Sequence, residues 1–209
     1  MLSRIDSSNW GKGNMNIYTA QTQAENITEI TNLLLKQTIT TVDVISMFFI
    51  LTFFFDTEDK MLKLINTLST VIKRGGLVIG TTMDGQATYN YMKGVKIIDN
   101  KFFRIDKKYN DNTDLTIGMP INISFKSKNT SVYHEQEEYL VPFEIFRKYM
   151  KNNGFTLEST GMFDCEKHSV SDNIKSRGVK DKSANINPCT TQDTIDFSSL
   201  NRWFVFKKN

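Results

Sequence analysis

Residues Val42 to Asp56 read VDVISMFFILTFFFD, and after a spacer the segment GGLVIGTTMDG follows, from Gly75 to Gly85. The first stretch is rich in Val, Ile and Phe and is bracketed by acidic residues, a composition typical of a strand buried on both faces of a parallel sheet. It is too short to cross a bilayer, because a spanning helix needs about 20 apolar residues.

The spacer between these stretches, residues 58–73, carries apolar side chains at helical spacing. The Gly75-Gly76 pair predicts the end of this helix before a second strand, LVIGTT. Strand, helix and strand form a βαβ unit, which places the carboxyl ends of both strands at one edge of the sheet. Open α/β sheets bind their ligands at that edge, so we expect an α/β fold with a site there.

The rest of the chain shows strand and helix patterns around this unit. Residues 95–141 alternate strand-like segments with turns rich in Asn, Asp and Lys, which predicts an antiparallel insert. Residues 164–196 have few large apolar side chains, which predicts a long loop or a partly disordered segment. The other predicted elements are a short strand at 16–20, helices at 25–35 and 143–151, and strands at 155–163 and 203–207.

Composition limits the classes of function. The 209 residues fit one domain, and the net charge of +3 is too small to argue by itself for nucleic acid. Cys165 and Cys189 stand singly, so neither a disulfide framework nor a metal site is indicated. Neither a signal peptide nor a membrane-spanning segment is recognisable, so we expect a soluble, intracellular protein.

Four segments in order resemble the guanine-N7 methyltransferase domain of mRNA capping enzymes, in particular those of large DNA viruses. MFFILTFFFD at 47–56 aligns with a family segment of the type (C/I)QFxxHYxF(E/H), and residues 71–84 end in a pattern like GGxxIGTTxD. EYLVPF at 138–143 matches E(F/Y)LVxF, and WFVFKK at 203–208 matches the C-terminal strand. The resemblance covers nearly the whole chain.

The resemblance implies transfer of a methyl group from S-adenosylmethionine to N7 of the cap guanine at the 5′ end of mRNA. It implies a Rossmann-like class I methyltransferase sheet. N7 already holds a lone pair, so such catalysis depends on alignment and on electrostatic stabilisation of the cationic purine rather than on a general base.

The resemblance also assigns candidate cap-binding residues. Glu138 would accept hydrogen bonds from the guanine N1 and N2 edge, although an acidic residue in HEQEEY can equally be a surface group. Thr52, Phe53 and Trp203 fall where the family has a His, a Tyr and an aromatic residue around the base. Thr52 cannot replace an imidazole and Phe53 lacks the Tyr hydroxyl, whereas Phe53 and Trp203 can stack on a base.

Four further residues are candidates for binding the cofactor. Gln21 and Thr22 follow the predicted strand at 16–20, where the family has an acidic residue that meets the adenine. A Gln amide can both donate to and accept from an adenine edge. Met47 and Phe48 would flank the same ring.

A glycine-rich segment of the family type DLGCGKGGD is not found before Asn16, so we expect only part of the methyltransferase sheet. The strand at 42–49 would then expose an edge. The chain alone would be inactive or nearly so, and the remaining part or a subunit of a capping enzyme would complete it. Two alternatives remain: a non-catalytic methyltransferase-like subunit that stimulates a partner, and an RNA-binding module. The expected place of action is the cytoplasm of an infected cell or the virion.

Overall fold

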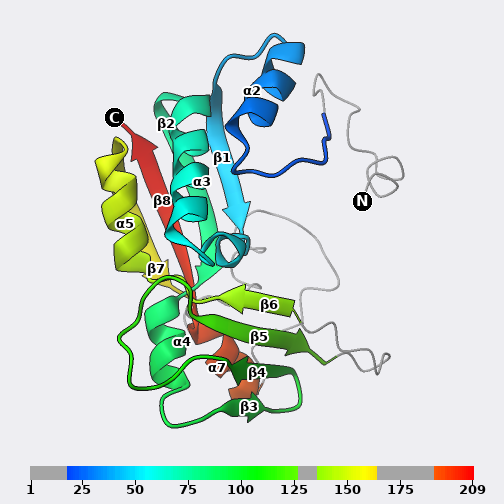
Figure 1. The fold of residues 1–209 in the computed structure, drawn as a ribbon, viewed down its shortest axis with the longest axis vertical. Helices are drawn as coiled ribbons and strands as arrows, with labels where there is room; N and C mark the ends of the chain where they lie inside the picture. The colour runs from blue at the N-terminus through cyan, green and yellow to red at the C-terminus, as the bar shows by residue number, and fades with distance from the viewer. Residues whose placement is uncertain (1–17, 127–135, 164–190) are drawn as a thin grey trace, which may run out of the picture.

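A computed structural model describes residues 18–126, 136–163 and 191–209, which form two four-stranded sheets (Figure 1). The first sheet has the order β1 (Val42–Phe48), β2 (Ile72–Met83), β8 (Asn201–Lys208) and β7 (Phe155–Met162). The second has the order β3 (Ile97–Asp99), β4 (Phe103–Lys107), β5 (Pro120–Phe125) and β6 (Gln136–Tyr139).

The first sheet is mixed, which confirms the α/β fold class. Strands β1 and β2 are parallel, whereas β8 runs antiparallel to both β2 and β7. The helices are α2 (Ile27–Lys36), the 3-10 helix η1 (Leu51–Phe54), α3 (Glu58–Val71), α4 (Gly85–Tyr91), α5 (Phe143–Asn152) and α7 (Gln192–Ser199). The predicted βαβ unit is thus present as β1, α3 and β2. The second sheet is antiparallel and occupies residues 97–139, within the range expected for the insert.

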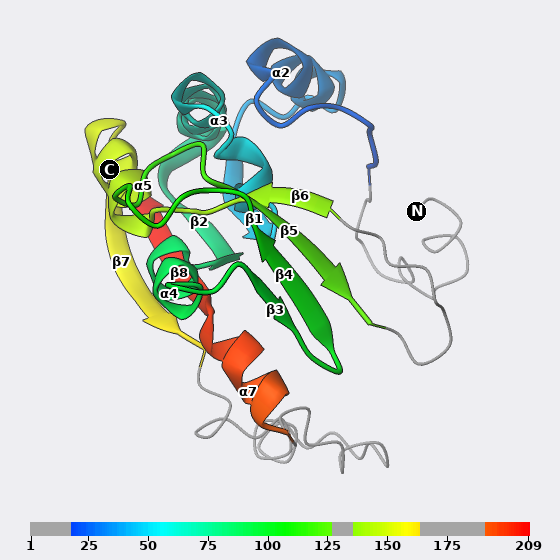
Figure 2. The ribbon, with the colours of Figure 1, turned by 60° about the horizontal axis from the view of Figure 1, so that its bottom comes forward.

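Helices α3 and α5 lie on one face of the first sheet (Figures 1 and 2). Phe204 and Phe206 of β8 point to this face and are buried against Phe143 and Phe146 of α5, with the rings of Phe146 and Phe206 5.6 Å apart. Burying each such side chain contributes roughly 1.5–3 kcal/mol, so this cluster is the main stabilising core of the sheet.

The opposite face of the same sheet stays open among the described residues. Val44 and Phe48 of β1 are 48% and 57% exposed, and Trp203 of β8 is 37% exposed. Strand β1 also forms the edge of the sheet, so the outer backbone groups of β1 have no strand partner in the described part of the chain. Exposed edges and apolar faces of this kind are typical of interaction surfaces.

A close approach of backbone explains Gly80 in β2. A methyl group there would lie 2.3 Å from the carbonyl oxygen of Met47 and 2.5 Å from the ring of Phe204. We expect Gly80→Ala to lower the free energy of unfolding by about 1–3 kcal/mol, because β1 and β2 would have to separate. Urea denaturation measures this, and Ser159→Ala, on an exposed position of β7, is the control with a change within about 0.5 kcal/mol. Equal effects of the two variants would contradict the packing described.

The second core joins the sheets. Met83 at the end of β2 and Leu200 before β8 pack with Phe103, Ile105 and other buried residues of the insert. An isolated bridge pairs Asp84 with Val141, and the amide of Gly85 donates to the carbonyl of Val141 at 2.8 Å. The end of β2 is therefore fixed directly against the chain that follows β6.

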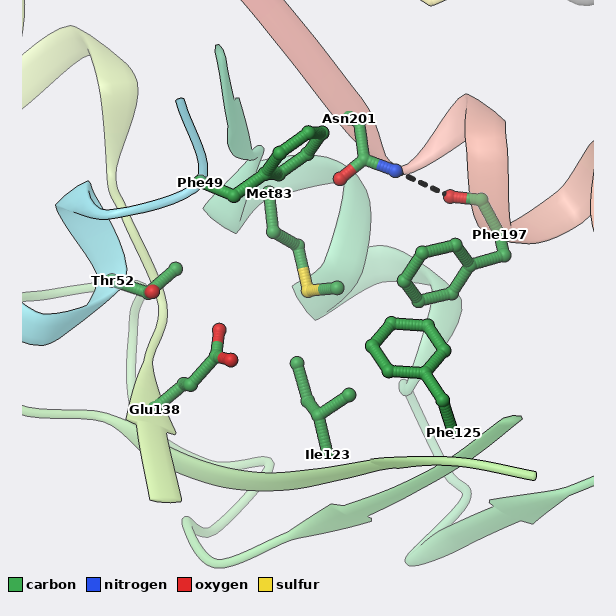
Figure 3. A pocket seen from close by; sticks show the side chains of 8 residues that line it. All are labelled: Phe49, Thr52, Met83, Ile123, Phe125, Glu138, Phe197 and Asn201. Carbon is green, nitrogen blue, oxygen red and sulfur yellow. Dashed lines mark hydrogen bonds between the residues drawn. The ribbon is translucent and has the colours of Figure 1, made fainter. Parts of the chain in front are cut away.

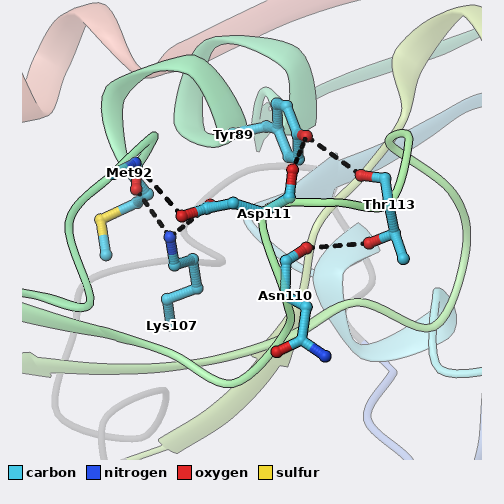
Figure 4. A network of polar contacts seen from close by, with 7 residues as sticks. Tyr89, Met92, Lys107, Asn110, Asp111 and Thr113 are labelled. Carbon is cyan, nitrogen blue, oxygen red and sulfur yellow. Dashed lines mark hydrogen bonds and ion pairs between the residues drawn. The ribbon is translucent and has the colours of Figure 1, made fainter.

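A polar network holds the loop after β4 against α4 (Figure 4). The buried Lys107 ammonium pairs with Asp111 and donates to the carbonyl of Met92 at 2.9 Å. Tyr89 of α4 donates to the carbonyl of Thr113 at 3.0 Å. Because Lys107 has both an anionic and a neutral acceptor, its burial is compensated and the loop is held in one position.

Three expectations about the elements need correction. Helix α3 ends at Val71 and β2 begins at Ile72, so Gly75-Gly76 lies within the strand rather than at the helix end. Gly75 has φ +78°, and the register between β1 and β2 shifts nearby, which explains the need for glycine. A short strand was expected at 16–20. Residues 18–20 are not in a strand, and residues 16 and 17 lie outside the described part.

The third correction concerns the long loop expected at 164–196. Residues 164–190, including both cysteines, lie outside the described residues. Residues 192–196 instead begin α7, because Thr191 and Thr194 form a reciprocal capping box at its start. In the described residues we find no helix long and apolar enough to cross a membrane.

Candidate functional site

A cavity of about 340 Å³ lies between the two sheets, at the carboxyl end of β1 and β2 (Figure 3). Its lining comes from both sheets and from α7, and consists of Phe49, Thr52, Met83, Ile123, Phe125, Glu138, Phe197 and Asn201. This size and the apolar, aromatic walls with a few polar groups are typical of a small-molecule site. Its place matches the sheet edge at which the sequence predicts a ligand.

The polar corner of this cavity combines two residues that lie far apart in the sequence. Thr52 belongs to η1, and Glu138 belongs to β6, which packs against η1. The Thr52 hydroxyl is buried, faces Glu138 in Figure 3 and makes no hydrogen bond of standard geometry to any described residue. Its interaction with the Glu138 carboxylate falls short of that geometry, so a polar ligand in this corner could satisfy both buried groups better.

Burial raises the pKa of the Glu138 carboxyl, and the nearby Thr52 hydroxyl lowers that pKa by a smaller amount. A carboxylate that is partly withdrawn from water gains more from an N–H donor of a ligand than an exposed one does. A planar base with adjacent N–H groups would satisfy it.

The raised pKa predicts a pH dependence. A ligand that donates hydrogen bonds to ionised Glu138 will lose affinity as the pH falls through the raised pKa, at a higher pH than the 4.5 typical of glutamate. The stability of the fold changes in the opposite sense, because folding favours the protonated form of Glu138. The contribution of Glu138 to the free energy of unfolding is fully present below pH 4.5, and it is lost as the pH rises through the pKa of the folded state. Glu138→Gln should therefore be slightly more stable than wild type at neutral pH, as thermal denaturation can show; a loss of stability would contradict this environment.

Aromatic rings form the other walls. Phe49 follows β1 with φ +55°, a left-handed backbone that aromatic residues rarely adopt, and its side chain is 49% exposed. Such strain costs on the order of 1–3 kcal/mol and is concentrated at functional sites. Phe125 and Phe197 contact each other edge to face, with centroids 5.2 Å apart, and Phe197 also contacts Phe103. These rings can stack on a base.

The structure brings together two of the four candidate cap-binding residues, Thr52 and Glu138. Phe53 packs against the main core instead of lining the cavity. Trp203 lies on the open face of the first sheet, over Gly161 of β7, and is not among the lining residues. Roles of Phe53 and Trp203 in binding a base therefore have no support from the cavity itself.

The four candidate cofactor residues do not form one site in the described structure. Gln21 is exposed, and the Thr22 hydroxyl is hydrogen-bonded to Glu29. Met47 is 2% exposed and lies in the core, whereas its neighbour Phe48 points to the opposite, open face. Gln21 and Phe48 are thus exposed, whereas Met47 is in the core and the Thr22 hydroxyl is engaged by Glu29.

Sequence reasoning missed most of the lining: Phe49, Met83, Ile123, Phe125, Phe197 and Asn201. Phe49 was part of the aligned segment, and its position directly after the strand was a usable signal. Phe125, Phe197 and Asn201 come from the insert and from α7, whose approach to the first sheet has no local sequence signature.

Solved structures with a similar course of the chain include two S-adenosylmethionine-dependent methyltransferases. The protein from Clostridium acetobutylicum is 14% identical, with a TM-score of 0.45, and the match covers 88% of this chain and 71% of that one. A putative methyltransferase from Listeria monocytogenes is 11% identical, with a TM-score of 0.45 and coverage of 91% and 68%.

A relative with a more specific name is the mRNA cap guanine-N(7) methyltransferase of Schizosaccharomyces pombe. It is 27% identical over 120 residues, which are 56% of this chain and 32% of the relative, so the match spans about a third of that protein. The family model of the mRNA (guanine-N(7))-methyltransferase domain matches residues 6–207, nearly the whole sequence. The chain therefore belongs to the mRNA (guanine-N(7))-methyltransferase domain family.

Proposed function

We propose that this chain binds the guanine of the mRNA cap in the cavity between its sheets, as part of a cap guanine-N7 methyltransferase. The observation that carries the proposal is the pairing of Glu138 and Thr52 in the corner of an otherwise apolar, aromatic cavity. Guanine offers adjacent N1 and N2 donors to the carboxylate, and its O6 can accept from the Thr52 hydroxyl. Family membership supports the same ligand.

The chemistry needs no base. When bound, S-adenosylmethionine would supply the methyl group: the N7 lone pair would form the new bond to the methyl carbon, the carbon–sulfur bond would break, and its electron pair would stay on sulfur. The chain's own residues hold the purine in place. The Glu138 carboxylate and the aromatic rings stabilise the positive charge that the purine gains.

We further propose that the remaining part or a subunit of a capping enzyme completes the cofactor site by pairing with the open edge of β1. The exposed Val44 and Phe48 and the unpaired edge support this, as does the absence of buried side chains in α2. A viral, cytoplasmic setting is supported by the TTMDG segment at 81–85, which is close to the form seen in large DNA viruses.

Calorimetric titration of the full 209-residue chain tests both proposals separately. We expect 7-methyl-GTP to bind and S-adenosylhomocysteine not to bind. Absence of 7-methyl-GTP binding would contradict the cap site. Tight binding of S-adenosylhomocysteine by the chain alone would contradict the need for a completing polypeptide, and it would leave the cap site intact.

A further inference from the structure

Asn201 has a fixed orientation at the end of the cavity that faces α7. Its side-chain nitrogen donates to the carbonyl oxygens of Phe197 at 2.8 Å and of Ser198 at 3.4 Å, and the residue is 3% exposed. Because backbone carbonyls only accept, the nitrogen must face them and the side-chain oxygen must face away. Figure 3 shows this oxygen, Oδ1, directed toward the cavity beside Phe49 and Met83.

The oxygen of Asn201 is available to a ligand. Among the described residues, none donates a hydrogen bond to Oδ1. Glu138 and Thr52 lie at one end of the cavity, and Asn201 lies at the other, with Met83 and Ile123 between them (Figure 3). The cavity thus has an acceptor at each end and apolar walls between.

A purine seated on Glu138 would direct its five-membered ring toward Asn201. The N1 and N2 groups of guanine lie on the six-membered ring, and C8 lies at the far end of the rigid, fused base. Methylation at N7 makes the five-membered ring cationic and polarises its C8–H bond. A carbonyl oxygen there interacts more strongly with the cation than with neutral guanine, through its dipole and a weak C–H···O contact.

We propose that Asn201 contacts the five-membered ring of the base through Oδ1 and gives the site its preference for the cationic, N7-methylated purine. This rests on the proposed cap function and adds a second recognition element to it. The same contact would stabilise the charge that develops in methyl transfer, so Asn201 would act on the product and on the transition state alike.

Two variants separate this role from a structural role in α7. Asn201→Leu removes both the oxygen and the donor to Phe197, whereas Asn201→Asp keeps an acceptor and loses the same donor. The measurement is the ratio of the Kd of GTP to the Kd of 7-methyl-GTP for the full chain. We expect Asn201→Leu to lower this ratio by roughly tenfold, the effect of one contact to a charged group. Asn201→Asp should keep or raise it.

A purely structural Asn201 would weaken both nucleotides equally in both variants, and that result would overturn the inference. Thermal denaturation of each variant verifies that it folds; Asn201→Ala replaces Asn201→Leu if that variant does not fold, and Asn201→Ser, which keeps an acceptor oxygen, replaces Asn201→Asp. If wild type binds neither nucleotide, or if binding does not depend on Glu138, the proposed function itself fails. Glu138-dependent binding with an unchanged ratio in Asn201→Leu would contradict only the role of Asn201.

Discussion

Glu138→Gln is expected to weaken binding of 7-methyl-GTP by about 2–3 kcal/mol, or roughly 30- to 150-fold. The amide keeps the size of the side chain, but it removes the charge and replaces one acceptor oxygen with a donor that faces the N–H groups of guanine. Burial around Glu138 strengthens this effect, since water cannot replace the lost interaction in the corner beside Thr52.

The residue next to Glu138 on β6 provides a matched control. Glu137 is exposed, and its carboxylate accepts a hydrogen bond from the Tyr139 hydroxyl at 2.8 Å. Its side chain points away from the cavity, so Glu137→Gln should leave the affinity nearly unchanged. Calorimetric titration of both variants with 7-methyl-GTP measures this difference in affinity. Equal affinities of Glu138→Gln and wild type would show that the carboxylate does not contact the ligand.

Asp84→Ala is expected to have the largest effect on stability, a loss of about 3–5 kcal/mol. Asp84 is 2% exposed, and its carboxylate accepts from Arg202 Nε at 2.6 Å and from the amide of Ala87 at 2.8 Å. The variant would leave Arg202 without its anion, over the ring of Phe143, and it would leave α4 without its N-cap.

Urea denaturation measures this loss. Asp84→Ala combined with Arg202→Met should be less destabilised than Asp84→Ala alone, because the second change removes the uncompensated charge. Asp59→Ala, which breaks an exposed pair with Lys63, is the control and should change stability little. If Asp84→Ala does not fold, Asp84→Asn provides the same comparison. A loss as small as that of Asp59→Ala would contradict the importance of this pair.

Local patterns predicted the βαβ unit because each of its elements has a clear period. The run from Val42 to Phe48 is a strand, and the apolar spacing after Glu58 is a helix. The Gly75-Gly76 pair was misplaced, since a glycine pair looks the same at a helix end and in a strand that needs a positive φ. Helix α7 was missed because its capping box, formed by two threonines, lacks the acidic residue that usually marks it.

The site was predictable only in part. Glu138 and Thr52 were identified through the family motifs that contain them, and they do meet in space. Phe197 and Asn201 reach the cavity because α7 packs on the insert through Phe103 and Phe125, a long-range contact that no local pattern encodes. Trp203 is placed at the base by alignment, and it shares a face of β8 with Asn201, but it lies two residues further along the strand and is not among the lining residues.

The most direct test is a crystal structure of the full chain with 7-methyl-GTP. We expect the base in the cavity between the sheets, with its N1 and N2 edge on the Glu138 carboxylate and its five-membered ring toward Asn201. A base bound elsewhere, for example stacked on Trp203 at the open face of the first sheet, would contradict the account.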